Sequence, residues 1–150
     1  MSRPDVRAMN TGMTTRILAE PAAPVPEAGY ALRVVRTTGR RSGEPRRTPV
    51  GVTRLHDHEY LVSPDRRRDW VRNLAATPEC ALLAGDEDRA RVAVPVGADE
   101  AAAVVSTYLR AVTVPWALKA FPVPPEATPA EITAHLDSIA VFRLDPAVRA

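Results

Sequence analysis

The sequence predicts an α+β fold that is mainly β: an antiparallel barrel or half-barrel of about six strands with peripheral helices. Six short runs either alternate apolar and polar residues or are rich in β-branched residues, and turn-forming residues separate them. Helical patterns are interspersed among these runs without the regular alternation of strand and helix that a doubly wound fold shows. The motifs Gly-x-Gly-x-x-Gly and Gly-x-x-x-x-Gly-Lys are both absent, which argues against Rossmann and P-loop nucleotide binding.

The composition fits one domain with a substantial core. The chain has 150 residues, of which 45% are hydrophobic. Its single cysteine, Cys80, excludes an internal disulfide, fits a reducing compartment and stands in an apolar run typical of a buried structural residue. No apolar stretch approaches the roughly 20 residues that span a bilayer, and no signal-peptide pattern is present. We therefore expect a cytoplasmic protein.

Residues 1–28 are predicted to form an N-terminal amphipathic helix and a proline-rich linker. Apolar residues recur at helical spacing in this segment: Val6, Met9, Met13, Ile17 and Leu18. The prolines of 21–26 cannot extend the helix. Packing against the body is our first expectation for the helix, while peripheral contact with an anionic membrane surface and fraying stay open. Residues 29–146 are expected to form the barrel domain and residues 147–150 a tail.

Three consecutive strands are predicted at the start of the barrel, over residues 30–37, 46–54 and 59–63. Short connections join them, so they should form a meander. Pro49 lies inside the second strand. Because proline donates no backbone hydrogen bond, we expect an edge position or a bulge there, with free backbone groups beside it.

The remaining elements follow the same two periodicities. Further strands are expected over residues 80–84, 89–96 and 139–144, and helices over residues 67–76, 99–112 and, from a capping box at 128–131, up to residue 138. The helix predicted over residues 67–76 has Trp70 on its apolar face and should end at the Thr77-Pro78 pair.

Positive charge is clustered in the connection between the first two strands, residues 37–49. All but one of the 20 basic residues are arginine, a bias that a GC-rich coding sequence also produces, and the net charge is only +2. Gly39, Gly43 and Pro45 favour a chain reversal. The reversal carries Arg40, Arg41, Arg46 and Arg47, with Glu44 as the only nearby acid. Guanidinium groups bind phosphate or carboxylate oxygens two at a time, so the segment predicts an anion-binding hairpin, with a solvated basic loop as the alternative.

Two other kinds of site are not expected. His56 and His58 resemble half of a metal site, but no further histidine or cysteine cluster completes it, so we expect no metal. A nucleic-acid partner would depend on the arginine clusters alone, since the net charge is modest, aromatic residues are few and no recognition motif is present. The predicted partner is a small molecule.

The order of these motifs resembles the deazaflavin-dependent nitroreductase family, split β-barrel oxidoreductases that use coenzyme F420. The resemblance covers roughly residues 32–144. It depends on Thr-Thr-Gly-Arg-Arg-Ser-Gly at 37–43, the Pro-Arg-x-x-Pro return at 45–49, and Trp-x-x-Asn-Leu at 70–74 after Ser63. It implies a split barrel and F420 as the cofactor, with FMN less expected.

The resemblance also implies roles for individual residues. The hairpin would hold the phosphate and glutamyl tail of the coenzyme, and the segment after Ser63 would border the deazaflavin ring. The implied cofactor-binding residues are Arg40, Arg41, Ser42, Gly43, Arg46, Thr48, Pro49, Ser63, Trp70 and Asn73. Trp70 could equally anchor its helix in the core, and Asn73 is the better candidate for a polar contact. Tyr108 is a candidate proton donor, although a phenol on a helix can equally be core, so no catalytic acid is assigned.

The implied function is an oxidoreductase that passes a hydride from reduced F420 to an electron-poor organic acceptor, such as a quinone, an enone or a nitro compound. The alternative is a non-catalytic carrier of a flavin, a haem-derived pigment or a lipid on the same barrel. The chain departs from the family between Ser63 and Trp70, where residues 64–69 replace a longer glycine-containing loop, and their arginines could add to the tail site. The acceptor, and the choice between monomer and homodimer, stay open.

Overall fold

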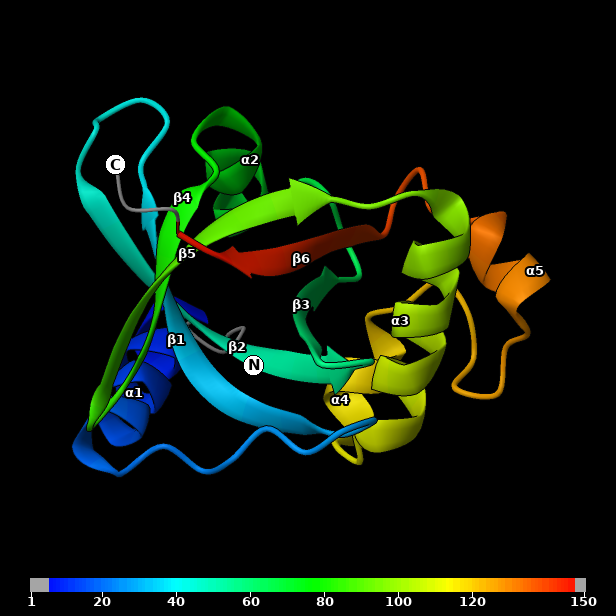
Figure 1. The fold of residues 1–150 in the computed structure, drawn as a ribbon, viewed down its shortest axis with the longest axis horizontal. Coiled ribbons are helices and arrows are strands. Elements are labelled where there is room, and N and C mark those ends of the chain that lie inside the picture. The colour runs from blue at the N-terminus through cyan, green and yellow to red at the C-terminus, as the bar shows by residue number, and fades with distance from the viewer. Residues whose placement is uncertain (1–5, 148–150) are drawn as a thin grey trace, which may run out of the picture.

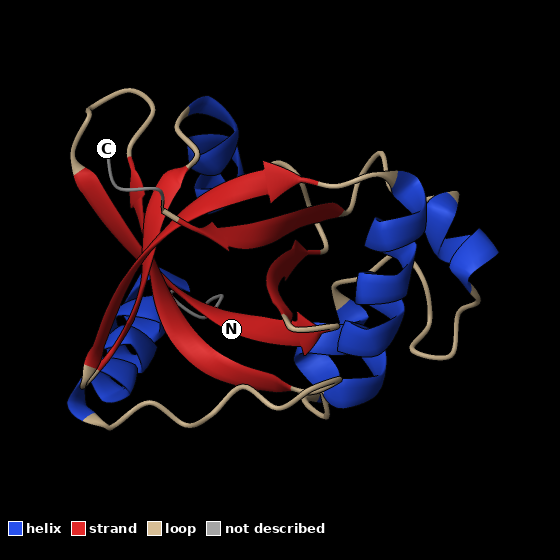
Figure 2. Cartoon of the chain, in the orientation of Figure 1, coloured by secondary structure: helices blue, strands red, loops and turns tan. Residues whose placement is uncertain are grey.

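Six strands form a closed barrel in which every neighbouring pair is antiparallel, with the neighbour order β1-β2-β3-β6-β5-β4 (Figure 1). This computed structural model describes residues 6–147, and their side chains from residue 8 onward. The predicted class, a mainly β barrel of six antiparallel strands with peripheral helices, is confirmed (Figure 2). Residues 148–150 of the expected tail lie outside the described residues.

The elements follow the predicted order closely. The strands are β1 (Tyr30–Thr38), β2 (Pro45–Leu55), β3 (His58–Ser63), β4 (Glu79–Ala84), β5 (Glu87–Pro95) and β6 (Ala140–Pro146). The helices are α1 (Val6–Ala19), α2 (Asp69–Ala76), α3 (Ala98–Ala111), α4 (Pro115–Lys119) and α5 (Pro129–Thr133).

Strand β2 pairs unequally with its two neighbours. It pairs with β1 without interruption from Thr53, opposite Tyr30, to Pro45, opposite Thr38. It pairs with β3 only over residues 52–55. Residues 45–51 therefore keep one unpaired backbone edge, and the edge position predicted for Pro49 is confirmed without a bulge. The first three strands form the predicted meander.

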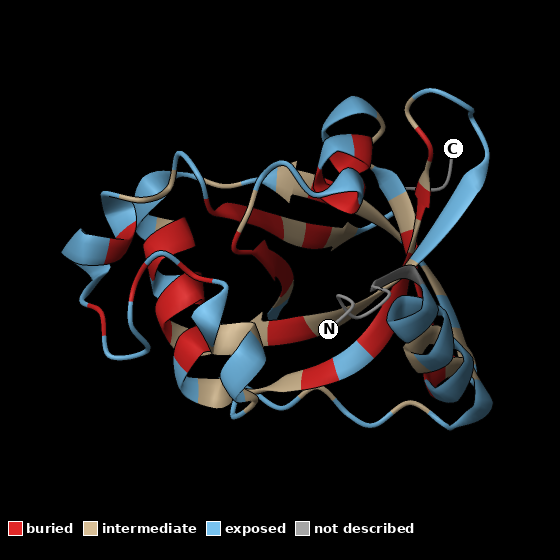
Figure 3. Cartoon of the chain, turned by 180° about the vertical axis from the view of Figure 1, so that it is seen from behind, coloured by how far each residue is buried: buried red, intermediate tan, exposed pale blue. Residues whose placement is uncertain are grey.

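The barrel interior is apolar at its centre, and α2 packs across the end where β1 and β3 finish. Buried side chains from alternate strand positions, among them Val35, Leu61 and Leu82, form one cluster with Trp70 and Leu74 of α2. Figure 3 shows buried segments alternating with more exposed ones along the barrel strands. Trp70 is only 6% exposed. Of the two roles left open for Trp70, the structure therefore supports the anchoring of its helix in the core.

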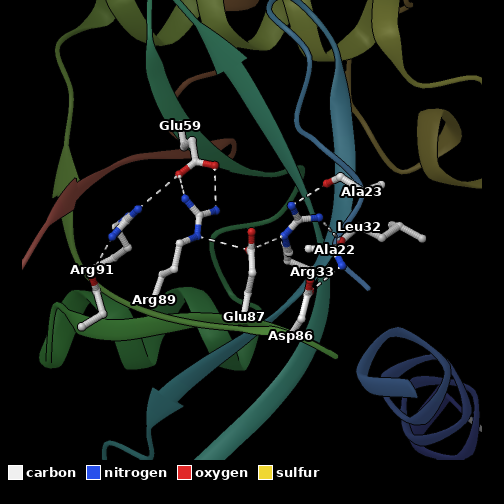
Figure 4. Close-up of polar contacts among 10 residues, drawn as sticks. Ala22, Ala23, Leu32, Arg33, Glu59, Asp86, Glu87, Arg89 and Arg91 are labelled. Carbon is white, nitrogen blue, oxygen red and sulfur yellow. Dashed lines mark hydrogen bonds and ion pairs between the residues drawn. The ribbon is translucent and has the colours of Figure 1, made fainter. Parts of the chain in front are cut away.

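Charged side chains fill the other end of the barrel interior (Figure 4). Arg33 Nε lies 3.1 Å from Glu87 Oε2, and Arg89 links Glu87 at 3.2 Å to Glu59 at 3.0 Å. Arg91 Nη2 lies 3.8 Å from Glu59. Strands β1, β3 and β5 are not neighbours, so these ion pairs cross the interior. Arg33 is 2% exposed, and a guanidinium this buried requires such partners.

Helix α1 packs on the outer face of β1 and β4, as first expected for it. Ile17 is buried among Val34 and Leu83, and Met13 and Leu18 pack at the edge of this cluster. The side chain of Val6, the first residue of the predicted apolar pattern, lies outside the described residues. Over residues 6–147, no helix has the length and apolar character needed to cross a membrane.

The proline-rich linker is fastened to the barrel along its length. Arg33 donates a hydrogen bond to the Ala23 carbonyl, and the Ala22 N–H donates to Asp86 Oδ1 at 2.7 Å (Figure 4). At the far end of the linker, Glu27 accepts hydrogen bonds from the backbone N–H groups of His56 and Asp57, at 2.9 and 3.2 Å. These bonds hold the pKa of the Glu27 carboxyl below its usual value. The segment is a strap across the barrel.

Helices α3 and α5 cover the outer face of β3 and β6. Val105, Leu109 and Ile132 are fully buried in this cluster, together with Ile139. The capping box predicted at residues 128–131 is present, but α5 ends at Thr133 and not at residue 138. Residues 134–138 form turns that are held by Arg66 on the Leu136 carbonyl, because the chain must bend there to enter β6.

A buried hydroxyl without a hydrogen-bond partner gives the first prediction. Thr53 is 0% exposed, and its Oγ1 has no partner among the described residues. We expect Thr53→Val to leave the free energy of unfolding unchanged or to raise it by up to about 1 kcal/mol, because valine fills the same space without a stranded hydroxyl. Thr37→Val is the control and should lower it by about 1 kcal/mol, since it removes a partner of Asn73. Urea denaturation checks both, and a destabilised Thr53→Val would contradict the assignment.

Cys80 gives a second prediction. Burial raises the pKa of its thiol to about 11, against an ordinary value of 9.0. At pH 8 the reactive thiolate should be about 100-fold scarcer than in the unfolded chain. Alkylation by iodoacetamide, followed by mass spectrometry, should therefore be slow in the native protein and rapid in urea. The structure places Cys80 as partly buried against the core and not fully buried as expected, and equal rates in both states would contradict even this partial protection.

Candidate functional site

The β1–β2 hairpin has a tip whose shape is fixed by its own backbone. Gly39 donates to the Glu44 carbonyl and Gly43 donates to the Gly39 carbonyl, both at 2.8 Å. Gly43 has a φ of +72°, a conformation that favours glycine. Ser42 Oγ accepts from the Glu44 N–H at 3.1 Å, and a Cβ on Gly39 would come within 2.6 Å of this oxygen. Gly39, Ser42 and Gly43 therefore shape the turn.

Arg40 is fastened to α2 at the base of this tip. The Arg40 backbone N–H and Nη1 both donate to Asn73 Oδ1, at 3.2 and 2.9 Å. Arg40 Nη2 pairs with Asp69 Oδ1 at 3.3 Å. Asn73 is 3% exposed and donates from Nδ2 to Thr37 Oγ1 at 3.4 Å. The Asn73 amide thus makes its polar contacts within the chain, to the hairpin and to β1, and its contact with a cofactor stays a prediction.

Arg41, Arg46 and Arg47 are exposed on the same hairpin, and none has a side-chain hydrogen bond or ion pair with the residues that the structure describes. Glu44, the acid nearest to them in sequence, is also exposed and pairs with none of them. In Figure 1 the hairpin extends past the barrel, beside α2. A rigid turn thus presents three unneutralised guanidinium groups, an arrangement suited to a multiply charged anion.

The segment that leads into α2 differs from its sequence-based interpretation. Ser63 is fully buried, and its hydroxyl donates to the Asp65 carbonyl at 2.8 Å, so it holds the turn. Arg67 pairs with Asp65 at 3.0 Å, and its hydrogen bond lowers the pKa of that carboxyl to about 2. Arg66 donates to the Leu136 carbonyl at 2.7 Å. Among the three consecutive arginines at 66–68, only Arg68 has no side-chain hydrogen bond or ion pair within the described part of the chain.

Tyr108 lies over the unpaired half of β2. A Cβ on Gly51 would lie 3.6 Å from Tyr108 Cε2, 3.8 Å from its hydroxyl oxygen and 3.4 Å from Tyr30 Cδ2. The Tyr108 ring packs on Phe121 with centroids 5.6 Å apart. Burial raises the pKa of the phenol, while the charge of Arg68 acts in the opposite direction. The hydroxyl has no hydrogen-bond partner among residues 6–147.

Sequence reasoning did not identify Gly51 and Tyr30 as neighbours of this phenol. The available signal was the glycine itself, because an isolated glycine inside a strand often marks a close approach of another group. Thr48 and Pro49 are half-buried on the free edge between Gly51 and the hairpin. The structure thus brings the free edge, the arginines and the phenol onto β2 and its immediate neighbours. No group of three histidine, cysteine, aspartate or glutamate side chains suited to a metal occurs in the described residues.

The residues fit an amphiphilic ligand with one strongly anionic end. The hairpin supplies partnerless guanidinium groups, and the free edge supplies backbone groups beside Pro49 that the sheet does not use. Farther along β2, Gly51 and the two tyrosines offer a less polar wall, and neither tyrosine hydroxyl has a hydrogen-bond partner among the described residues. A deazaflavin with a phosphodiester and a glutamyl tail has this division of charge, so the donor set fits it.

Comparison with solved structures supports the fold. A haem-binding protein from Mycobacterium smegmatis is 20% identical with a TM-score of 0.50; the match covers 96% of this chain and 52% of that one, so this chain spans about half its length. The haem storage protein HutZ from Vibrio cholerae is 11% identical with a TM-score of 0.54, over 99% and 93% of the two chains. A structure described as a domain-swapped dimer is 20% identical with a TM-score of 0.55, over 93% and 92%. No curated protein matches the sequence.

The fold is a barrel of the split-barrel kind, and its β1–β2 hairpin carries arginines that have no side-chain partner among the described residues. The model of the F420H(2)-dependent quinone reductase family matches residues 8–118. The chain belongs to the F420H2-dependent quinone reductase family. The resemblance to deazaflavin-dependent oxidoreductases is thereby confirmed at the level of the family, with its reductase class and its coenzyme F420.

Proposed function

We propose that this protein is a reductase that uses F420H2 to reduce an electron-poor organic acceptor: a quinone in the first place, or an enone or a nitro compound. The observation that carries the proposal is the set of partnerless arginines on a rigid hairpin, next to the unpaired edge of β2, in a chain of this family. The fold alone would serve carriers as well as enzymes.

The hairpin would bind the anionic end of the coenzyme. Arg41, Arg46 and Arg47 can each offer a planar pair of donors to phosphate or carboxylate oxygens. Because the hairpin backbone is held by hydrogen bonds at the tip and by Asn73 at the base, little backbone conformational entropy is lost when an anion binds, and the main entropic cost is the ordering of the arginine side chains. Affinity should therefore depend on the charge of the tail and weaken with salt.

The less polar end of β2 would receive the ring and the acceptor. The reduced coenzyme, when bound, supplies the hydride. Tyr108 would hold a proton at its Oη atom for the oxygen of the acceptor that becomes negative on reduction. Burial raises the pKa of Tyr108 above its ordinary value of 10.0, so the phenol stays protonated at neutral pH. Phe121 packs on the ring and the Gly51 backbone lies beside the hydroxyl, so both would limit the approach of water to it.

The alternative of a carrier of haem-derived pigment, flavin or lipid has a direct test. Protein purified under native conditions should carry no visible pigment and should bind added F420 in a simple saturable manner. A stoichiometric haem-derived or lipid ligand that copurifies, with no F420 binding, would favour the carrier.

Removal of the free arginines should weaken coenzyme binding. We expect the triple variant R41A/R46A/R47A to raise the Kd for F420 about 100-fold or more, since each charge-assisted contact contributes about 1 kcal/mol or above. Absorbance or fluorescence titration measures this. The control is R54A. Arg54 pairs with Asp57 at 3.1 Å, and this pair lies away from the hairpin tip. An unchanged Kd in the triple variant would contradict the proposed tail site.

Tyr108→Phe should lower turnover without loss of coenzyme binding. We expect kcat to fall by about 100-fold, because general acid catalysis typically contributes that much, while the Kd for F420 changes little. In the wild type the group acts as an acid, so the rate should decline as pH rises through its raised pKa, and this decline should be missing in the variant. Steady-state rates against pH would show it. A Tyr108→Phe variant with full activity would remove the phenol from the reaction.

A further inference from the structure

Arg40 differs from the other hairpin arginines because two groups of α2 already hold it. Asn73 Oδ1 accepts from both the backbone and the side chain of Arg40, at 3.2 and 2.9 Å. The other half of the same amide donates to Thr37. The buried side chain of Asn73 thus connects two parts of the hairpin to α2: Thr37, near the end of β1, and Arg40, at the start of the tip. We name this set, Thr37, Arg40 and Asn73, the hairpin latch.

The second partner of Arg40 has opposite properties. Asp69 is the first residue of α2, and its side chain is 87% exposed. Its ion pair with Arg40 Nη2 measures 3.3 Å, and Arg40 itself is 20% exposed. An exposed pair of this kind contributes little, because water and salt screen it. The buried Asn73 contacts are costly to break, because each would leave a desolvated group unpaired.

We propose that Asn73 is a positioning residue that holds Arg40 ready for an anionic group of the coenzyme, and that Asp69 is the counter-ion which this group displaces. The identity of the anion, a phosphate or carboxylate of F420, depends on the proposed function. The latch itself depends only on contacts within the chain.

This exchange has a physical reason. In the free protein Asp69 neutralises Arg40 and so reduces repulsion among the clustered hairpin arginines. When a multiply charged ligand arrives, its oxygens can contact Arg40 and the neighbouring free guanidinium groups together, which the single carboxylate of Asp69 does not. Asn73 keeps Nη1 and the Arg40 backbone in place meanwhile, so only one of the contacts of the guanidinium changes. A neutral deazaflavin without the tail would gain nothing from the exchange.

The decisive variant is Asp69→Asn, which removes the competing charge. We expect the Kd for F420 to fall about two- to fivefold, the range that an exposed ion pair supports. Binding of a deazaflavin that lacks the phosphodiester and the glutamyl tail should not change. The matched control is Asp57→Asn, which removes the counter-ion of Arg54 from an exposed pair at 3.1 Å that lies away from the hairpin tip, and it should leave both affinities unchanged. Weaker or unchanged F420 binding by Asp69→Asn would overturn the exchange.

The latch is tested by Asn73→Ala. We expect faster amide hydrogen exchange at Arg40 and an F420 affinity about tenfold lower, although every arginine is retained. The double variant Asn73→Ala/Arg40→Ala should bind F420 no more weakly than Arg40→Ala alone, because Asn73 acts through Arg40. Thr37→Val removes only the longest bond of the latch, so it is the milder variant if Asn73→Ala does not fold, and its affinity should fall in the same direction. Loss of thermal stability with an unchanged Kd in either variant would overturn the positioning role.

A probe other than the coenzyme keeps the two proposals separate. Inorganic pyrophosphate should shift the Nε–Hε resonance of Arg40 in the wild type and bind more tightly to Asp69→Asn. If it does so while the wild type binds no deazaflavin, the proposed function is wrong and the counter-ion exchange is supported. If the wild type binds F420 and Asp69→Asn changes the affinity for neither F420 nor pyrophosphate, the exchange is wrong and the proposed function still stands.

Discussion

The unequal pairing of strand β2 is the constraint on which the rest of the structure depends. This strand pairs with β1 over residues 45–53, but with β3 only over residues 52–55. Beyond this short ladder β1 still pairs with β4 over residues 34–36. Only the ends of β1 and β2 past these pairs continue as a two-stranded hairpin, while the chain after β3 turns into α2. One backbone edge is left free as a result. Pro45 and Pro49 suit this edge because neither has an N–H to satisfy, and Arg46 and Arg47 discourage pairing with another strand.

The free hairpin would be mobile without α2. A two-stranded ribbon outside a sheet is marginally stable alone, and so is a helix of eight residues. Here each supports the other. The apolar face of α2, with Trp70 and Leu74, is buried in the barrel interior, and Asn73 on the same helix bonds the base of the hairpin. The packing of the core and the geometry of the anion site therefore share one element, so a cavity made beneath α2 should be felt at the hairpin.

Much of this architecture is predictable from the sequence because it depends on local periodicity. Alternation with a period of two predicts the six strands and the faces of β6, where Val141 packs outside and Phe142 inside. The chemistry of proline predicts the edge at Pro49. What is not predictable depends on partners far away in sequence. Ser63 bonds within its own turn and was implied to bind cofactor, whereas the proximity of Gly51 to Tyr108 needs a helix that begins almost fifty residues later.

The arginines show most clearly that contacts between residues far apart in the chain are not predictable from the sequence. The sequence predicts an anion-binding hairpin to which the arginines of residues 64–69 could add, and the structure divides the arginines by partner. Arg33, Arg89 and Arg91 belong to the ionic network that fills one end of the barrel, and Arg66 and Arg67 fasten a turn. The free guanidinium groups of the hairpin stand at one end of the exposed edge of β2, and the free phenol stands at the other. In the proposed function, an anionic cofactor held by the first group would extend toward the second. Choice of acceptor should therefore depend on the side chains that α3 and the segment after it place around Gly51, and not on the basic hairpin that identifies the family.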